Sequence, residues 1–420
     1  MTPVAAPAST TYFSVVLDQA KEDLARRGVP IFDFGIGDPI EPTPPFIRQA
    51  LIDALSPVSQ YPTIVGQRRL RQAVAGWAQR RLDVTLDPDT QVLPAAGSKE
   101  AIFHLPLAIV GADEQRRRLV YPSPSYPVYE GSARFSGCIP HPVPLSEENG
   151  YRLELDALGP EVLSQTCIAW INYPHNPTGA SIGLDYLQRQ VEVARAHKIL
   201  LCADDCYLDL YFTEQPPPGL LQVTQTGVLS FGSLSKRSGM TGYRSGYIAG
   251  DARVIATLKR ARPNFGVGSQ DFVQAAATVA WSDDAHVAER RAIFRAKRDR
   301  LAAFLTDRGY VVSGSQGAIY LWVKVPTADR EQAPWSEAER GQAPWSEAER
   351  GQAPWSEAER GQAPWSEAER GFFARLLEHG IVVSPGESFG KGGEGYFRLA
   401  LVPSLEQIEQ AIATWERITL

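Results

Sequence analysis

The stretch VLSFGSLSKRSGMTGYRSGYIA, residues 228–249, carries two apolar runs separated by a polar, glycine-rich segment. The first run, Val228–Phe231, is typical of a buried strand, and Lys236 follows shortly after it. A lysine close to the end of a buried strand is costly unless it is paired or used chemically. The stretch therefore indicates either an active amine held at the edge of a sheet or a surface loop with a basic tip.

Further apolar runs alternate with helical patterns through the middle of the chain, as at Glu100–Val110 and Leu184–His197. Most of these runs lack the polar alternation of a half-exposed strand, as expected for a sheet that helices cover on both faces. The order predicts an α/β fold with a mostly parallel sheet, in which ligands bind past the carboxyl ends of the strands. The expected strands are Gln91–Ala96, Arg118–Tyr121, Cys167–Tyr173, Ile199–Ala203, Val228–Phe231 and Tyr243–Ala249.

The last part of the chain has a different order. A long helical pattern over Gln270–Asp307 precedes short strands and single helices, which predicts a smaller α+β domain. We therefore predict an N-terminal segment (1–45) that joins the small domain, a large α/β domain (46–290) and the small C-terminal domain (291–420). The elements expected in the small domain are the strands Tyr310–Val312, Ala318–Val325, Ile381–Ser384 and Tyr396–Leu401 and helices near Phe372–His379 and Leu405–Glu416.

Composition excludes several classes of function. The 420 residues are 44% hydrophobic, enough for a large core, and the net charge of −6 favours neither nucleic acid nor an anionic membrane. The four cysteines show no CxxC spacing and the six histidines are scattered, so we expect no metal site. The first residues have no basic or apolar stretch, and no apolar run approaches membrane-spanning length. We therefore expect a cytoplasmic protein.

A decamer occurs four times between Glu331 and Arg370, first as EQAPWSEAER and then three times as GQAPWSEAER. Ten helical steps of about 100° turn each Trp by roughly 80° from the last, and every copy contains a helix-breaking proline. The repeats therefore predict short helical turns joined by loops, not a coiled coil. They are either a Trp-bearing partner surface or a tandem expansion in a tolerant surface loop, and we favour the expansion.

Hydroxyls and an arginine surround Lys236. An amine that forms a Schiff base needs a place where its pKa falls, and Ser233, Ser235 and Arg244 beside it suit a phosphate. Gly97-Ser98-Lys99 opens a helix after a strand, where free amides also suit a phosphate. Together these residues predict an anchor for pyridoxal phosphate.

Three polar side chains follow other buried strands. Asn176, in NPTG, lies in a turn that can hold an amide rigidly, although the motif alone could be only a turn. Asp204 needs a buried partner, which a pyridinium nitrogen would be. Tyr207 lies three residues further on, and we expect Asp205 to be a loop acid or a helix-terminus residue.

Two more residues suit a flat cofactor and an anionic substrate. Tyr126, in YPSPSYPVY, could stack on a flat ring or pack within its loop. Arg398 stands on an otherwise apolar strand and needs an anionic partner, for which a carboxylate fits best.

These elements, in this order, resemble the fold-type I pyridoxal-phosphate aminotransferases of class I/II. The resemblance covers nearly the whole chain except the repeats and the first dozen residues. Stretches such as YPTIVGQRRLR, DDCYLDL and SPGESFGKGGEGYFRLALVPS are most similar to N-succinyldiaminopimelate aminotransferases of lysine biosynthesis. Where that subfamily often has Asp-Glu, this chain has Asp204-Asp205.

The resemblance implies a role for each motif. Lys236 would be the Schiff-base lysine and proton carrier, Asp204 would pair with the pyridine nitrogen, and Asn176 and Tyr207 would bind the ring hydroxyl beneath a stacked Tyr126. Gly37, Asn176 and Arg398 would bind the substrate carboxylate. The residues expected around the phosphate are Gly97, Ser98, Lys99, Ser233, Ser235, Arg244 and, lent by the neighbouring subunit of a homodimer, Tyr61.

The implied reaction moves an amino group from a donor, glutamate, to an oxo acid. The subfamily resemblance implies N-succinyl-LL-diaminopimelate and 2-oxoglutarate as the substrate pair. Alternatives are another class I/II transaminase (aspartate, aromatic or LL-diaminopimelate), a pyridoxal-phosphate carbon–sulfur lyase, and a non-catalytic interaction protein. The expected partners are small-molecule amino and oxo acids, with no nucleic acid or membrane.

Overall fold

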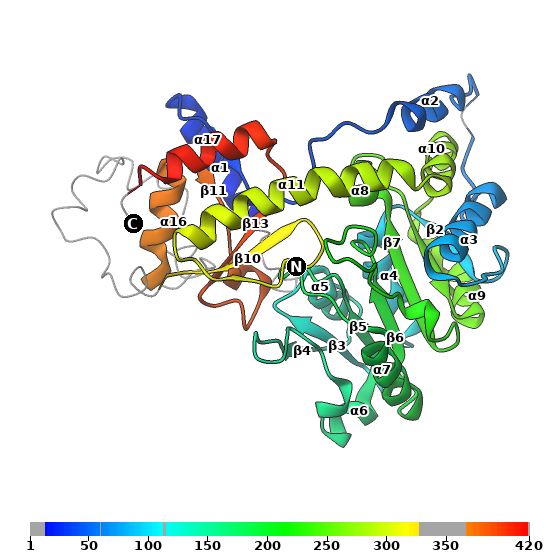
Figure 1. Cartoon of the computed structure of the whole chain (residues 1–420). Helices are drawn as coiled ribbons and strands as arrows, with labels where there is room; N and C mark the ends of the chain where they lie inside the picture. Colours follow the sequence, from blue (N-terminus) through cyan, green and yellow to red (C-terminus); the bar gives the residue numbers. More distant parts are fainter. Residues whose placement is uncertain (1–12, 59, 112–114, 327–366, 419–420) are drawn as a thin grey trace, which may run out of the picture.

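A seven-stranded sheet forms the centre of the larger part of the molecule (Figure 1). The computed structural model describes residues 13–58, 60–111, 115–326 and 367–418. The strand order is β2-β8-β7-β6-β5-β3-β4, and all neighbours are parallel except β8, which is antiparallel to β2 and β7. The strands are β2 (Val92–Ala95), β3 (Arg118–Ser123), β4 (Ile139–Pro144), β5 (Thr166–Ile171), β6 (Leu200–Asp204), β7 (Val228–Ser233) and β8 (Gly246–Gly250). The mostly parallel α/β fold is therefore confirmed.

The sequence did not predict β4, which contains Pro140, Pro142 and Pro144. These prolines alternate with residues whose amides face β3, and β4 is the edge strand, so the missing N–H groups point away from the sheet. The amides of Ile139 and Leu145, which flank the prolines, each donate to a carbonyl on the β3 side over 2.7 Å. Alternating prolines therefore leave the ladder intact.

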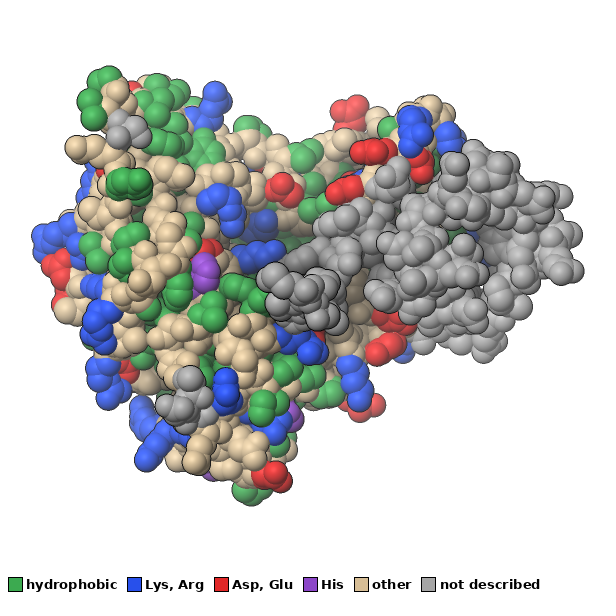
Figure 2. Space-filling view, turned by 180° about the vertical axis from the view of Figure 1, so that it is seen from behind, with side chains coloured by type: hydrophobic (Ala, Val, Ile, Leu, Met, Phe, Trp, Pro, Cys, Tyr) green, Lys and Arg blue, Asp and Glu red, His purple; other side chains and the backbone are tan. Residues whose placement is uncertain are grey.

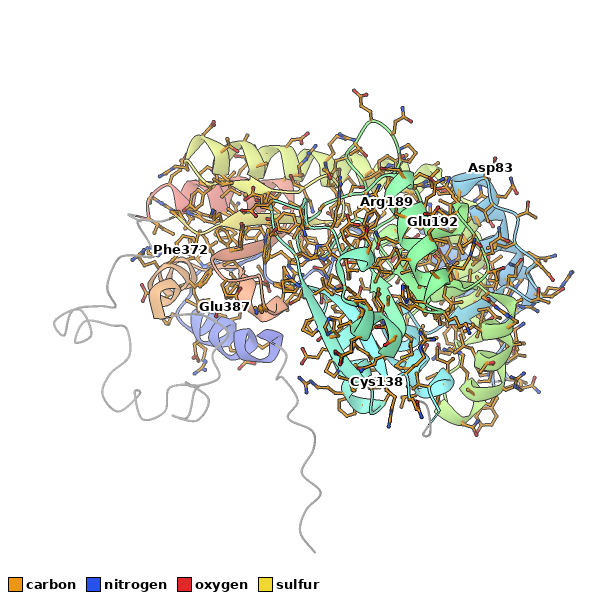
Figure 3. The ribbon with its side chains drawn as sticks, turned by 90° about the horizontal axis from the view of Figure 1, so that it is seen from below. Asp83, Cys138, Arg189, Glu192, Phe372 and Glu387 are labelled. Atoms are coloured by element: carbon orange, nitrogen blue, oxygen red, sulfur yellow. The ribbon has the colours of Figure 1, made fainter. Side chains whose placement is uncertain are left out.

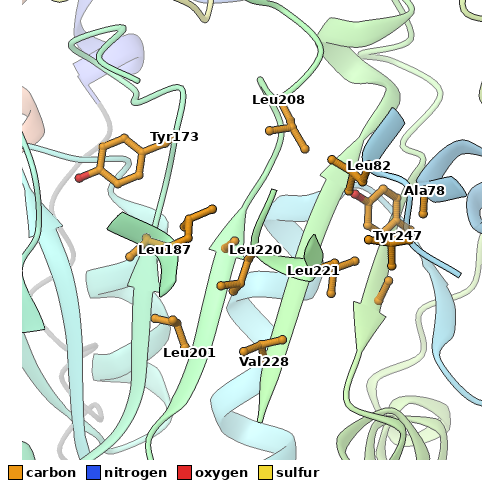
Figure 4. Close-up of a cluster of buried hydrophobic side chains, with 14 of the residues drawn as sticks. Ala78, Leu82, Tyr173, Leu187, Leu201, Leu208, Leu220, Leu221, Val228 and Tyr247 are labelled. Atoms are coloured by element: carbon orange, nitrogen blue, oxygen red, sulfur yellow. The ribbon is translucent and has the colours of Figure 1, made fainter. Parts of the chain in front are cut away.

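Helices cover both faces of this sheet. Along β5, Ala169 and Ile171 pack into one hydrophobic core, whereas Ile168 and Trp170 pack into another. Figure 4 shows part of the first core, where Leu187 of α7 and Ala78 of α3 lie with the strand residues Leu201, Val228 and Tyr247. The helices of this part are α2 (Pro45–Asp53), α3 (Arg68–Leu82), α4 (Ser98–Ile109), α5 (Val128–Phe135), α6 (Pro160–Gln165), α7 (Leu184–Ala196), α8 (Leu234–Arg237), α9 (Ala252–Ala261) and α10 (Asp271–Ser282), with 3₁₀ turns η1 (Leu155–Ala157), η2 (Leu220–Gln222) and η3 (Arg262–Phe265).

A smaller antiparallel sheet, in the order β12-β13-β10-β9, forms the second part. The N-terminal segment joins it through the parallel pair β1 and β11. Figure 3 shows Phe372 of α16 and Glu387 of η4 in this part, and Asp83 and Arg189 in the larger part. The elements are α1 (Phe13–Arg26), β1 (Phe32–Asp33), α11 (Ala285–Asp307), β9 (Val312–Ser313), β10 (Tyr320–Lys324), α16 (Glu367–Glu378), β11 (Ile381–Val382), β12 (Ser384–Pro385), η4 (Gly386–Phe389), β13 (Tyr396–Ala400) and α17 (Leu405–Trp415).

Two predicted elements are divided. The helix expected over Gln270–Asp307 is two helices, α10 and α11, which are broken where Asp283 leaves the helical conformation. The Asp283 carboxylate accepts from the amide of His286, and this side chain–backbone bond starts the second helix. Likewise, the strand expected over Ile381–Ser384 is β11 and β12, which pair in different sheets.

The long helix α11 runs from the larger part to the smaller one (Figure 1). It crosses the boundary predicted at residue 290, and the domain limits at 45 and 290 stay predictions. Nearly all of the repeat segment 331–370 lies outside the described residues, and α16 begins within its last copy. None of the helices in the described ranges combines the length and the apolar composition that crossing a bilayer requires.

Candidate active site

The predicted cofactor residues meet at one edge of the large sheet. Asp204 ends β6 and Ser233 ends the parallel neighbour β7, so their carboxyl ends open on the same side. Ser98 begins α4 at this edge, where its Oγ lies 2.8 Å from Sγ of Cys206. A Cβ on Gly246 would come within 3.2 Å of the Ser98 amide, so the start of β8 also adjoins the start of α4.

Asp204 is a buried carboxylate that receives only neutral donors among its described contacts. Oη of Tyr129 donates to it over 2.8 Å, and the amide of Cys206 donates over 3.3 Å. Burial raises the pKa of Asp204, because the charged form loses hydration, and these hydrogen bonds oppose the shift. A cation placed against this carboxylate would therefore be strongly favoured.

Lys236 lies in the short helix α8, which starts directly after β7. Burial lowers the pKa of its amine, and the nearby charges of Arg244 and Arg398 lower it further, whereas Asp38 acts in the opposite direction. The lysine backbone is held in place as well, since Nε of Arg290 donates to its carbonyl over 3.3 Å. A lysine with a lowered pKa supplies the neutral, nucleophilic form of the amine.

Hydroxyls, free amides and a guanidinium group form a cradle at the start of α4. Oγ of Ser233 caps α8 by accepting from the Ser235 amide over 3.1 Å, and the two hydroxyls lie 2.9 Å apart. Gly97 precedes α4 with φ of +87°, and a Cβ there would come within 2.7 Å of Nη2 of Arg244. Only glycine allows the arginine to approach the helix start so closely, and this arrangement suits an anion.

Arg398 and Asn176 meet in a buried pair. Nη1 of Arg398 donates to Oδ1 of Asn176 over 2.9 Å, and Nη2 donates to the carbonyl of Gly35 over 2.8 Å. The guanidinium carbon lies 4.1 Å from the ring centre of Tyr320 and 4.5 Å from that of Phe389. Burial lowers the pKa of Arg398, and within the described part of the chain its Nε is buried without a hydrogen bond. A carboxylate ligand would satisfy this donor and neutralise the charge.

Tyrosines line the rest of the site. The Tyr126 ring packs edge-on against Tyr129, the donor to Asp204, at a centroid distance of 6.3 Å, and Nζ of Lys99 lies 5.7 Å from the Tyr126 ring centre. Oη of Tyr207 lies 2.8 Å from Oη of Tyr320. The sequence did not single out Tyr320, because an aromatic residue on an apolar strand packs equally well into a core.

Asp205 lies one residue past the end of β6, in a loop position as the sequence predicted, but it is buried. Its amide donates to the carbonyl of Phe231 over 2.8 Å, so the hydrogen bonding of β6 continues by one position. Because strand residues alternate in direction, its carboxyl turns to the other face from Asp204 and accepts from Oγ of Ser230 in the core. Burial is the main reason why the pKa of Asp205 rises to about 7.

The sequence model described as aminotransferase class I and II matches residues 29–414. The chain belongs to this family. Among its relatives are the LL-diaminopimelate aminotransferases of Aquifex aeolicus strain VF5, 35% identical over 95% of this chain and 94% of the relative, and of Oleidesulfovibrio alaskensis, 34% identical over 96% and 95%. The sequence-based resemblance to class I/II aminotransferases is thus confirmed.

Solved structures agree with this assignment. Substrate-bound BacF from Bacillus subtilis superposes on this aminotransferase with a TM-score of 0.84 at 25% identity, covering 100% of this chain and 98% of BacF. A probable N-succinyldiaminopimelate aminotransferase from Thermus thermophilus gives a TM-score of 0.80 at 26% identity, covering 97% and 100%. Enzymes of this family depend on pyridoxal phosphate, so this aminotransferase uses that cofactor.

Proposed function

We propose that this aminotransferase exchanges an amino group between glutamate and an oxo acid built on the diaminopimelate skeleton, a step of lysine biosynthesis. The names of the relatives at 35% and 34% identity favour LL-diaminopimelate as the substrate. Sequence stretches such as SPGESFGKGGEGYFRLALVPS, and the solved structure at 26% identity, favour N-succinyl-LL-diaminopimelate. We rank LL-diaminopimelate first because its enzymes share more identity with this chain.

The observation that carries the catalytic proposal is that one sheet edge holds both the buried carboxylate of Asp204, at the end of β6, and an amine of lowered pKa, Lys236, directly after β7. Pyridoxal phosphate, when bound, supplies an electron-withdrawing ring that stabilises the negative charge left by removal of the substrate α-proton. Asp204 would hold the positive charge on the pyridine nitrogen. This cation would also offset the cost of burying the Asp204 carboxylate, whose described donors are neutral. Nζ of Lys236, in its neutral form, would accept the α-proton.

The remaining predicted residues would bind the cofactor and the substrate. Asn176 and Tyr207 would donate to the ring hydroxyl oxygen, and Tyr126 would stack on the ring. Arg398 would bind the substrate carboxylate beside Gly37, using the buried Nε that makes no hydrogen bond in the described chain. The phosphate would lie in the cradle formed by Gly97, Ser98, Lys99, Ser233, Ser235 and Arg244.

We also propose a homodimer in which Tyr61 reaches the neighbour's phosphate. Large apolar side chains are exposed along one segment of the single chain, and Tyr61 is fully exposed. This segment includes α2, which lies at the upper right in Figure 1 and therefore at the upper left in Figure 2, where hydrophobic side chains are seen at the surface. Such a patch is typical of a surface that another protein covers. The exposed residues are Ile40, Phe46, Ile52, Leu55, Val58, Tyr61 and Val65.

The test is a substrate panel on the purified, cofactor-loaded enzyme. LL-diaminopimelate, N-succinyl-LL-diaminopimelate, aspartate and phenylalanine are offered as amino donors with 2-oxoglutarate, and glutamate formation is measured. We expect kcat/KM for one of the two diaminopimelate donors to exceed that for aspartate and phenylalanine. Higher values for aspartate or phenylalanine would overturn the proposed substrate. Keto-acid formation without any oxo acid would instead indicate lyase chemistry.

A further inference from the structure

Tyr320 connects two parts of the site that the sequence placed in separate motifs. It lies on β10 in the small sheet with 3% of its surface exposed. Its hydroxyl forms the 2.8 Å hydrogen bond with Tyr207, which follows β6 of the large sheet, and the rings meet edge to face at 5.6 Å. The guanidinium carbon of Arg398 lies over its ring, 4.1 Å from the ring centre.

The two hydroxyls share one hydrogen bond, and each has a single proton to donate. If Tyr207 gave its proton to Tyr320, it would have none for a cofactor ring oxygen. If Tyr320 is the donor, the O–H of Tyr207 stays available and becomes a stronger donor, because hydrogen bonds in a chain polarise one another. The direction of this one bond therefore decides what Tyr207 offers to the site.

The surroundings favour Tyr320 as the donor. A cation over the face of an aromatic ring draws electron density from it, and Arg398 occupies that position over Tyr320. Burial raises the pKa of Tyr207 well above its ordinary value, which makes its hydroxyl a weaker hydrogen-bond donor. The position of Arg398 over the Tyr320 ring points to a chain of hydrogen bonds that runs from Tyr320 to Tyr207 and onward into the site.

Gly37 makes room for this contact. A Cβ at position 37 would lie 2.3 Å from Oη of Tyr320, closer than side chains approach. The backbone at Gly37 does not require glycine, since its φ lies outside the left-handed region. The space for the tyrosine hydroxyl is therefore a reason for glycine at this position.

We propose that Tyr320 is a positioning residue, which donates its hydroxyl proton to Tyr207 and supports the plane of the Arg398 guanidinium group. This rests on the proposed function, in which Tyr207 donates to the cofactor ring oxygen. A donor to that oxygen favours the deprotonated form of the bound chromophore and lowers the pH at which its visible absorbance changes. Tyr320 therefore tunes this midpoint, and it also affects carboxylate binding through its ring.

The first experiment titrates the visible absorbance of the cofactor-loaded enzyme from pH 5 to 10. Tyr320→Phe, which keeps the ring, should raise the midpoint by roughly half to one pH unit. When Tyr207→Phe is present in both proteins that are compared, Tyr320→Phe should no longer shift the midpoint. The control is Tyr186→Phe, which removes a buried hydroxyl bonded to the Leu153 carbonyl and should leave the midpoint unchanged.

Other outcomes of the pH titration would contradict the proposal in different ways. A lower midpoint for Tyr320→Phe would mean that Tyr207 is the donor in this pair, and an unchanged midpoint would remove the role of the hydroxyl. If the parent shows no visible band with pyridoxal phosphate, the proposed function itself fails. If Tyr320→Phe does not fold, Gly37→Ala replaces it, since crowding the hydroxyl should raise the midpoint in the same direction.

A second measurement tests the role of the ring. Binding of glutarate, a dicarboxylate probe, is followed by titration of the cofactor-loaded enzyme. Tyr320→Phe should bind it within about twofold of the parent, whereas Tyr320→Leu should bind it roughly five to twenty times more weakly, because the cation loses the closer of its two aromatic contacts and keeps only Phe389. Equal binding by the Leu and Phe variants would show that the ring does not support Arg398.

Discussion

The guanidinium group of Arg398 donates to the side-chain oxygen of Asn176 over 2.9 Å, although 222 residues separate the two in the chain. The backbone of Asn176 is also held in place, because its backbone N–H donates to Oδ1 of Asn172 over 2.9 Å. The residue proposed to bind the substrate carboxylate is therefore attached to one proposed to bind the cofactor ring. A change in either should affect the binding of both ligands.

Replacing Lys236 with alanine should lower turnover by at least about a thousandfold, because the proposed nucleophile and proton acceptor is removed. The visible absorbance of bound cofactor should change as well, while the phosphate cradle still retains some cofactor. Turnover and absorbance spectra check this. Lys259→Ala is the control, since Nζ of Lys259 donates to the Asp89 carbonyl at the surface. Near-normal turnover of Lys236→Ala would refute the assignment.

Asp204→Asn keeps the shape of the side chain but removes its charge. The barrier should rise by a few kcal/mol, so kcat falls roughly 10²- to 10³-fold, as when one preorganised electrostatic group is lost. Steady-state kinetics measures the effect, and Asp205→Asn serves as the matched control because its carboxyl faces Ser230 on the other side of the sheet. An unchanged kcat for Asp204→Asn would show that another group holds the ring nitrogen.

Asp205 should make stability depend on pH. Its pKa is raised to about 7 in the folded chain, so its ionisation opposes folding: the penalty is absent below the ordinary pKa, grows as pH rises and is complete above about pH 7. Asp205→Asn removes that penalty, so its stability relative to the parent should improve between pH 4 and 8 by roughly 2–4 kcal/mol. Denaturant unfolding at several pH values measures this. A pH-independent difference would show that Asp205 is ionised throughout.

Tyr61 can be tested by mixing two inactive variants. If it serves the neighbour's site, a dimer of Tyr61→Phe and Lys236→Ala chains has one site that carries neither lesion. With random exchange, activity should recover to roughly a quarter of the parent value. The test requires that Tyr61→Phe alone is strongly impaired. No recovery despite demonstrated subunit exchange would place each site within one chain.

Deleting Gly341–Arg370 should leave cofactor binding, dimerisation and turnover close to the parent. The remaining copy still ends in EAER before Gly371, the same residues that begin α16. Loop length itself contributes only about 0.6 kcal/mol per doubling, so shortening the segment has little effect on folding. Size-exclusion chromatography and kinetics check this. Loss of the dimer or of turnover in a folded protein would make the repeats part of the working structure.

Local patterns in the sequence predicted six of the seven strands of the large sheet and the residue types of the site. Buried strands such as Val228–Phe231 have an apolar signature within a few residues, and Asp204, Asn176 and Lys236 stand at the ends of such strands or a few residues after them. The class I/II aminotransferase family could also be predicted, because its motifs are short and contiguous. The proposed roles of these residues stay predictions.

Only the tertiary structure decided which of these groups touch. The bond between Asn176 and Arg398, the position of Tyr320 between Tyr207 and Arg398, and the space that Gly37 leaves for it depend on contacts between distant segments. Strand β4 escaped prediction for a related reason, since alternating prolines are tolerated only at an edge, and a strand becomes an edge only when the sheet is assembled. Local propensity acts over a few residues, whereas burial and hydrogen-bond partners are set by packing between segments that are far apart in the chain.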